Sequence, residues 1–255
     1  QEESPYFDPS SEMGLWVSTQ SDWSKYASAL IPVHEALVSE KLPGIVDEIA
    51  TEAATKKTDL EKIEFVAARV AQEFRYFGDW RRRHGGYIPR SLGEIAQSRY
   101  GDCKDLSLVV TAVYRALGMK ADLAWIWRGE IAPPKMTYEL PIDTAFNHAV
   151  ARVETGGNEY WVDATNPVSY ARTPWPDIAG RQAFLLDAKN PRLVSTPALS
   201  SKASSYITRM RFTLKKDDTF AVNGDIELKE RAAIGLNARA FYQPLETVNY
   251  EIIRG

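Results

Sequence analysis

Three residues of types that together carry out acyl transfer occur in the order cysteine, histidine, aspartate. Cys103 is the single cysteine among 255 residues, and His148 and then Asp163 follow it. A cysteine acts as a nucleophile when an adjacent base accepts its proton and a carboxylate orients that base. These residue types therefore predict a thiol nucleophile with His148 as its base.

A helix is predicted to begin at Cys103. Apolar residues recur after it at spacings of three and four, and the pattern ends at Gly118, a residue type that commonly caps helices. The apolar positions are Leu106, Val109, Val110, Val113 and Leu117. The unpaired N–H groups and the positive dipole end of a helix N-terminus favour a thiolate over a thiol. We therefore expect a reactive sulfur at this position.

Two strands are predicted to bring the histidine and the aspartate together. Residues 145–153 and 159–163 have strand-forming composition, and the polar segment 154–158 between them is typical of a hairpin turn. His148 falls early in the first strand, and Asp163 ends the second. Antiparallel pairing about the turn would place both near the same end of the hairpin, where the carboxylate can fix the tautomer of the imidazole.

The helices that must support this site have their own start signals. Segments 58–61 and 91–94 are capping boxes, in which a threonine or serine precedes a glutamate by three positions. The first box opens an amphipathic pattern formed by Ile63, Val66, Ala67, Val70 and Phe74. An earlier helix is predicted over residues 21–39, and within it His34 is interpreted as a surface residue.

Three motifs of this chain resemble those of the transglutaminase-like superfamily of cysteine enzymes. The motifs are segments 100–105, 146–148 and 161–165. They occur in the family's order within residues 60–190, which is a specific signal compared with a lone cysteine motif. The resemblance implies Cys103 as nucleophile, His148 as general base and acid, and Asp163 as orienting carboxylate. It also implies an α+β fold with a papain-like transglutaminase core, in which helices pack on an antiparallel β-sheet.

Flanking β-rich segments are expected on both sides of this core. The chain resembles bacterial periplasmic or membrane-attached proteins that hold the transglutaminase-like domain between two β-rich domains, although the chain itself does not determine its compartment. We expect a linker or the tail of a preceding β-domain at 1–20, the catalytic domain at 21–200, and the start of a β-rich C-terminal domain at 201–255. Alternation in segments 206–214 and 219–228 predicts paired strands. Because the chain begins with glutamine, we expect it to be processed or excised.

The composition is that of an ordinary globular enzyme domain. Apolar residues make up 44% and charged residues 25%, and the net charge of −3 gives no electrostatic basis for nucleic-acid binding. No apolar run approaches the roughly 20 residues that span a bilayer. A single cysteine excludes an intramolecular disulfide. We expect no metal and no organic cofactor, and a peptide or protein substrate.

Each singled-out residue also has a structural interpretation. A lone cysteine at a helix start is often a small buried apolar residue, a strand histidine can be a satisfied core residue, and an aspartate can cap a turn. Their joint order favours catalysis. The basic segment 81–84 is interpreted as a solvated loop, the alternative being a cleft rim that binds acidic peptides or cell-wall carboxylates.

Acyl transfer also requires donors for the developing oxyanion. The N–H of Cys103 is one, because the first turn of a helix has no internal acceptor for it. The upstream candidates for the second are Tyr87, Tyr76 and Trp80, of which we favour Tyr87. The predicted function is a peptidase or amidase that hydrolyses amide bonds through a thioester. The alternative is a binding or assembly module that retains the fold with an idle triad.

Overall fold

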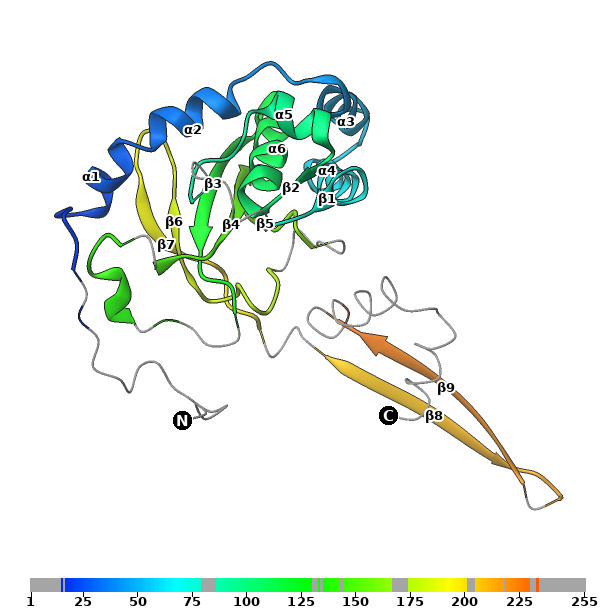
Figure 1. Cartoon of the computed structure of the whole chain (residues 1–255). Coiled ribbons are helices and arrows are strands. Elements are labelled where there is room, and N and C mark those ends of the chain that lie inside the picture. The colour runs from blue at the N-terminus through cyan, green and yellow to red at the C-terminus, as the bar shows by residue number, and fades with distance from the viewer. Residues whose placement is uncertain are drawn as a thin grey trace. The chain divides into compact units, whose positions relative to one another are not determined.

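The chain separates into two compact units, residues 1–198 and residues 199–255 (Figure 1). The first unit combines helices with a sheet, and the second contains a β-hairpin. The structure is a computed structural model. It describes residues 15, 17–78, 86–129, 133, 135–142, 145–166, 174–200, 205–217, 219–229 and 233.

A five-stranded antiparallel sheet is the framework of the first unit, with strand order β5-β4-β3-β6-β7 (Figure 1). The strands are β3 Lys120–Ile126, β4 His148–Thr155, β5 Asn158–Val162, β6 Gln182–Leu185 and β7 Arg192–Ser195. Alternate residues of β3 enter two different hydrophobic clusters. Leu123 and Trp125 join the larger cluster on the helical side, whereas Ala124 and Ile126 join a smaller cluster with Ile178. Both faces of the central strand are therefore covered, as the apolar run 123–126 in its second half requires.

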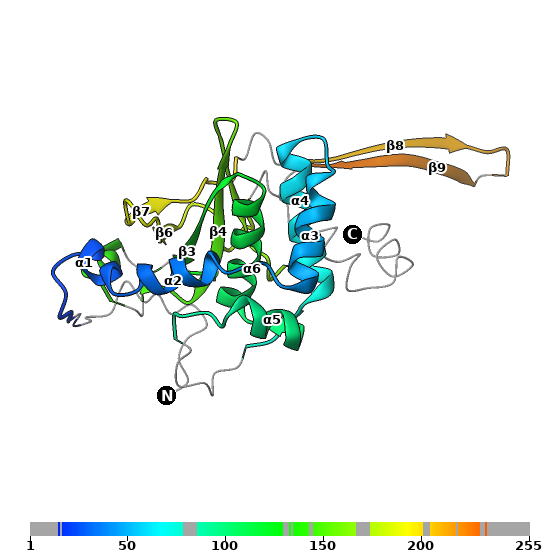
Figure 2. The ribbon, with the colours of Figure 1, turned by 90° about the horizontal axis from the view of Figure 1, so that it is seen from above.

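Helices pack on one face of this sheet. They are α1 Trp23–Ser28, α2 Ile31–Val38, α3 Gly44–Ala54, α4 Asp59–Glu73, α5 Leu92–Ser98 and α6 Cys103–Ala116. Helix α6 lies between the sheet and the pair α3 and α4, and its residues 105–114 are all buried (Figure 2). The short strands β1 Arg75–Tyr76 and β2 Tyr100–Gly101 pair in parallel just before α6. The predicted α+β fold, with helices packed on an antiparallel sheet, is confirmed.

Both predicted capping boxes form. The side chain of Thr58 accepts a hydrogen bond from the N–H of Glu61 at the start of α4, and Ser91 and Glu94 make the same exchange at the start of α5. In return, the backbone N–H groups of Thr58 and Ser91 donate hydrogen bonds to the carboxylates of Glu61 and Glu94. Among the helices of the described residues, none is long and apolar enough to cross a membrane.

The helix predicted over residues 21–39 is two helices. Helix α1 begins after Asp22, whose carboxylate accepts a hydrogen bond from the N–H of Lys25. Helix α2 begins anew at Ile31. Pro32 lies in the first turn of α2, where its missing N–H removes no hydrogen bond, whereas inside one continuous helix it would break the ladder.

The turn between β4 and β5 is tighter than predicted. It consists of Gly156 and Gly157, with φ values of 55° and 78°, in place of the five residues 154–158. Two consecutive positive φ angles suit the two-residue turns that match the twist of paired strands. Strand β4 begins at His148 and not at 145, so the histidine is the first residue of its strand.

The second unit contains the hairpin of β8 Tyr206–Leu214 and β9 Phe220–Leu228. Every residue of β8 is exposed. The hairpin matches the two alternating segments of the sequence. The assignment of residues 201–255 to a following β-rich domain stays a prediction. So does the assignment of residues 1–20 to a preceding one, of which 1–14 and 16 lie outside the described residues.

Candidate active site

Cys103 is the first residue of helix α6 and is half-buried. Asp102 caps the helix, and its carboxylate accepts hydrogen bonds from the N–H groups of Lys104 and Asp105 at 3.2 and 3.3 Å. Within the described residues, the N–H of Cys103 has no hydrogen-bond acceptor. The predicted helix start is confirmed, and it leaves one backbone donor beside the sulfur for a ligand anion.

Close packing holds the turn that precedes the cysteine. A Cβ on Gly101 would lie 2.7 Å from Asp105 Cβ and 3.3 Å from Leu106 Cδ2, so this position requires glycine. The guanidinium and the backbone N–H of Arg90 donate to the Asp105 carboxylate at 2.8 and 2.9 Å. These bonds tie the loop before α5 to the first turn of α6.

His148 and Asp163 form a buried pair, and the sulfur of Cys103 lies beside them. Nε2 of His148 is 2.9 Å from Oδ2 of Asp163. When the β4–β5 register is continued, the β4 residue opposite Asp163 lies two positions after His148. Residues two positions apart on a strand point to the same face, so the side chains of His148 and Asp163 share one face. The side chain of Cys103 lies beside the same imidazole, contributes to raising its pKa, and lines the same pocket. Because Nε2 is engaged by the carboxylate, Nδ1 is the nitrogen left for the sulfur. The structure thus brings the three predicted residues together, and their catalytic role stays a prediction.

Further donors saturate the Asp163 carboxylate. Oδ1 accepts hydrogen bonds from the N–H and the hydroxyl of Thr165 at 3.0 and 2.7 Å, and Oδ2 accepts one from the amide of Asn166 at 3.1 Å. The guanidinium of Arg128 lies 3.3 Å from Oδ2 and bonds to Asp177 at 2.6 Å. Arg128 and Asn166 were not predicted. Nothing local in the sequence relates Arg128, in the loop after β3, to Asp163, whereas Asn166 lies only three positions after it.

Burial and charge oppose each other at the His148–Asp163 pair. Burial lowers the pKa of His148, but the charge and hydrogen bond of Asp163, together with Cys103, outweigh it and raise that pKa to about 10. Burial raises the pKa of Asp163, but His148, Arg128 and Thr165 lower it to about 2. An imidazolium facing a carboxylate is therefore the favoured state at neutral pH. A positive imidazolium is also the partner that a cysteine thiolate requires.

A buried hydrogen bond ties the helix of the cysteine to the strand of the histidine. The hydroxyl of Ser107 donates to the backbone carbonyl of Ala149 at 3.0 Å. Ser107 lies one turn after Cys103, and Ala149 directly follows His148. The bond therefore fixes α6 against β4 at the level of the site. No sequence signal indicated it, because the pairing of a helix serine with a distant strand depends on tertiary packing.

A pocket of about 520 Å³ opens beside the sulfur and the imidazole. This volume falls in the range of about 300–1,000 Å³ that is usual for small-ligand pockets. Its polar lining residues are Asp102, Lys104 and Asn147, in addition to Cys103 and His148. Its aromatic lining residues are Tyr76, Tyr87, Trp125, Trp127 and Phe146. A substrate could reach the sulfur through this pocket.

Two of the three candidates for the second oxyanion donor line the pocket. The ring of Tyr87 is half-buried and lies 4.8 Å from that of Trp125. Burial, followed by the charge of Cys103, raises the pKa of the Tyr76 phenol, so its hydroxyl stays protonated and able to donate. Trp80 and the basic segment 81–84 lie outside the described residues.

His34 is buried, which corrects its assignment to the surface. His34 is only 2% exposed. Its ring nitrogen Nδ1 lies 2.9 Å from the carbonyl oxygen of Leu30, and Nε2 lies 3.0 Å from the carbonyl oxygen of Tyr87. A polar ring can be buried here because each ring nitrogen lies within hydrogen-bond distance of a carbonyl oxygen, to which a protonated ring nitrogen can donate. His34 thus holds the backbone of the Tyr87 loop in place.

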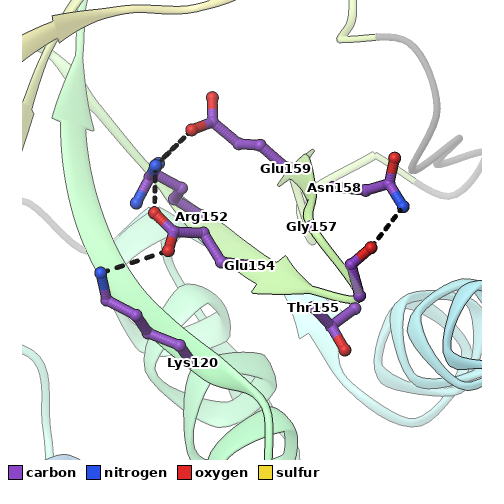
Figure 3. Close-up of a pocket in the computed structure, with 8 residues that line it drawn as sticks. Lys120, Arg152, Glu154, Thr155, Gly157, Asn158 and Glu159 are labelled. Carbon is purple, nitrogen blue, oxygen red and sulfur yellow. Dashed lines mark hydrogen bonds and ion pairs between the residues drawn. The ribbon is translucent and has the colours of Figure 1, made fainter.

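A second pocket, of about 470 Å³, lies at the β4–β5 turn (Figure 3). Arg152 pairs there with Glu154 and Glu159, and Lys120 pairs with Glu154 at 3.3 Å. The charges in this pocket pair with one another and include no nucleophile, so we interpret it as structural. Over the ranges that the structure describes, no group of His, Cys, Asp and Glu side chains is arranged to hold a metal ion.

Comparison with known proteins identifies a family match over this region. Residues 47–165 match the family model of the Transglutaminase-like superfamily. The matched segment contains Cys103, His148 and Asp163. No curated protein matches the sequence significantly.

Solved structures that are similar to this chain include two proposed proteases and a TGase. A proposed protease from Parabacteroides distasonis is 12% identical with a TM-score of 0.48, over 68% of this chain and 31% of that one. A TGase is 15% identical with a TM-score of 0.34, over 55% and 37%. A proposed cysteine protease from Cytophaga hutchinsonii is 15% identical with a TM-score of 0.37, over 80% and 57%. The matches cover only 31% to 57% of the lengths of those proteins.

Proposed function

Residues 47–165 belong to the transglutaminase-like superfamily, and from this premise we propose that the protein is a cysteine peptidase or amidase. Cys103 is the nucleophile, His148 the general base and acid, and Asp163 the carboxylate that orients the imidazole. The supporting observation is the continuous contact from the Cys103 sulfur through His148 to Asp163 at the edge of an open pocket. A structural interpretation would need a separate explanation for each of the three residues.

In the first half-reaction, the thiolate of Cys103 attacks the carbonyl carbon of an amide. A carbon–sulfur bond forms, and the carbonyl electrons move onto oxygen to give a tetrahedral oxyanion. The imidazolium of His148 then donates its proton to the leaving nitrogen as the carbon–nitrogen bond breaks. The amine departs, Cys103 is left as a thioester, and His148 is left neutral.

In the second half-reaction, neutral His148 accepts a proton from water as the water oxygen attacks the thioester. The carbon–sulfur bond breaks, the acid leaves, and the thiolate–imidazolium pair is restored. An amine in place of water would give transamidation by the same steps. We propose water as the acceptor, because water enters an open pocket freely whereas an amine must first be bound.

Two donors are proposed for the oxyanion. The first is the N–H of Cys103, and the second is the phenol of Tyr87, with Tyr76 as the alternative from the same pocket. Removing one such donor costs about 10²–10³ in kcat. Comparing Tyr87→Phe with Tyr76→Phe therefore assigns the second donor to the residue whose loss is larger.

The flanking segments and the cellular setting are proposals of the same kind. We place a peptide or protein substrate in the pocket and β-rich domains on either side of the core, and the β8–β9 hairpin supports the domain that follows. The resemblance to periplasmic and membrane-attached bacterial proteins supports a location outside the cytoplasm.

A cysteine-reactive peptidyl electrophile tests the proposed nucleophile. Because Cys103 is the single cysteine of the chain, every thioether formed lies at this residue. Wild type should be labelled rapidly at neutral pH, Cys103→Ala should not be labelled, and His148→Ala should be labelled slowly while remaining folded. Hydrolysis of a fluorogenic peptide amide should follow the same order. Equal labelling of wild type and His148→Ala would refute the proposal and favour the idle binding module.

A further inference from the structure

Aromatic rings wall the pocket beside the proposed nucleophile. They come from β1, the loop before α5, the end of β3 and the residues before β4, which meet only in the folded chain. The rings are those of Tyr76, Tyr87, Trp125, Trp127 and Phe146. Trp125 and Trp127 are two residues apart along an extended chain, so both face the pocket side of the sheet.

The floor of this pocket is continuous with the hydrophobic core. Trp125 and Phe146 are 2% and 4% exposed, and their ring centroids are 6.4 Å apart. Trp125 also packs on Phe184 of β6 at 6.1 Å and on Tyr87 at 4.8 Å. Rings held by core packing keep their positions before a ligand binds, so little ordering cost falls on binding.

The charged groups at the pocket are already paired. Lys104 forms an ion pair with Asp102, and His148 forms one with Asp163. A charged side chain of a ligand would therefore leave water without gaining an opposite charge from the described lining residues. Burying an unpaired charge is costly, whereas burying an apolar side chain is favourable.

Resting on the function proposed above, we propose that this aromatic pocket selects the substrate. It binds an aromatic or large aliphatic side chain of the acyl donor, next to the carbonyl that Cys103 attacks. The half-buried rings of Tyr87 and Trp127 contact that side chain, and Trp125 and Phe146 lie beneath it. The competing hypothesis is that the pocket binds an acyl donor with an acidic side chain.

A matched series of peptidyl chloromethyl ketones tests this inference on wild-type protein. The compounds differ only in the residue next to the reactive carbon, which is Phe, Leu, Ala, Glu or Lys, and the thiolate displaces chloride to form a thioether. The second-order labelling rate of Cys103 should be at least about tenfold higher with Phe and Leu than with Ala, the usual effect of filling an apolar pocket. Glu and Lys should be slower than Ala.

Two outcomes separate this inference from the proposed function. Labelling that is equal across the series, or fastest with Glu, would overturn the aromatic selectivity while leaving the nucleophile in place. Absence of labelling by every compound would refute the proposed function, and the inference with it.

Variants of the pocket wall give a second test. Trp127→Ala should reduce the preference for Phe over Ala, and Trp127→Phe should retain most of it. Tyr206→Ala is the control, because it removes an exposed aromatic ring from the β8–β9 hairpin. If Trp127→Ala keeps the wild-type preference for Phe over Ala and is labelled by the Ala compound at the wild-type rate, then Trp127 does not contribute to substrate selection.

Discussion

Replacing Asp163 with asparagine should convert His148 to a neutral imidazole at neutral pH. Asp163 is the main group that raises the pKa of His148 from 6.5 to about 10 against the opposing effect of burial. That difference corresponds to on the order of 5 kcal/mol of imidazolium stabilisation. Asparagine preserves the size of the side chain but removes its charge. Burial should then dominate, and the pKa of His148 should fall below 6.5.

Proton nuclear magnetic resonance of the imidazole rings measures this change directly. The chain contains three histidines, so single replacements assign the signals. In wild type, His148 should stay protonated through neutral pH and titrate near pH 10, whereas in Asp163→Asn it should titrate below pH 6.5. Asp187→Asn is the matched control. Its carboxyl also has a lowered pKa, but it is held by the N–H groups of Lys189 and Asn190, away from the pocket.

The kinetic consequence follows from the same loss of charge. Peptide hydrolysis by Asp163→Asn should fall by up to about 10⁴, the loss seen when the carboxylate of an analogous triad is replaced. Electrophile labelling should fall less, because the probe needs no proton on a leaving nitrogen. A His148 titration that is the same in wild type and in Asp163→Asn would refute the reasoning, since it would show that the carboxylate does not stabilise the imidazolium.

His148, Ser107 and Gly101 each support a further prediction. Because the pKa of His148 is raised from 6.5 to about 10, its contribution to stability is complete below pH 6.5 and is lost as the pH rises through 10. Urea unfolding should show that wild type loses stability relative to His148→Gln over that pH range, and a constant difference in the free energy of unfolding across the range would contradict this. Ser107→Ala should lower the free energy of unfolding by about 0.5–1.5 kcal/mol and slow the labelling of the cysteine, because α6 loses its bond to β4; wild-type labelling would argue against a positioning role. Gly101→Ala should cost about 1–3 kcal/mol in urea unfolding, since its Cβ would lie 2.7 Å from that of Asp105. Gly93→Ala is the control, because its Cβ would meet nothing within 4 Å; equal effects of the two substitutions would show that the contact is not limiting.

Local patterns in the sequence determined the elements that carry the candidate site. The start of α6 at Cys103 follows from the cap residue Asp102 and an apolar repeat, and both capping boxes depend on hydrogen bonds between residues three positions apart. Such contacts form within one turn, so neighbouring residues suffice to predict them. The order of Cys103, His148 and Asp163 then indicated the family, which the match over residues 47–165 bears out.

Local patterns were less reliable where a residue's surroundings come from elsewhere in the chain. His34 lies in a helix as predicted, but the carbonyl of Tyr87 gives its ring a partner and allows it to be buried. The flanking domains, and the catalytic roles of Cys103, His148 and Asp163, also stay predictions.

Tertiary structure alone decided how the elements meet around the site. Arg128 reaches Asp163 and Asp177, which lie 35 and 49 positions later in the chain, and Ser107 bonds to a strand 42 positions away. The aromatic wall likewise combines rings from segments that are distant in the sequence. These contacts depend on the register of the sheet and on how α6 packs against it. Each is a property of the whole fold that no local pattern of residues encodes.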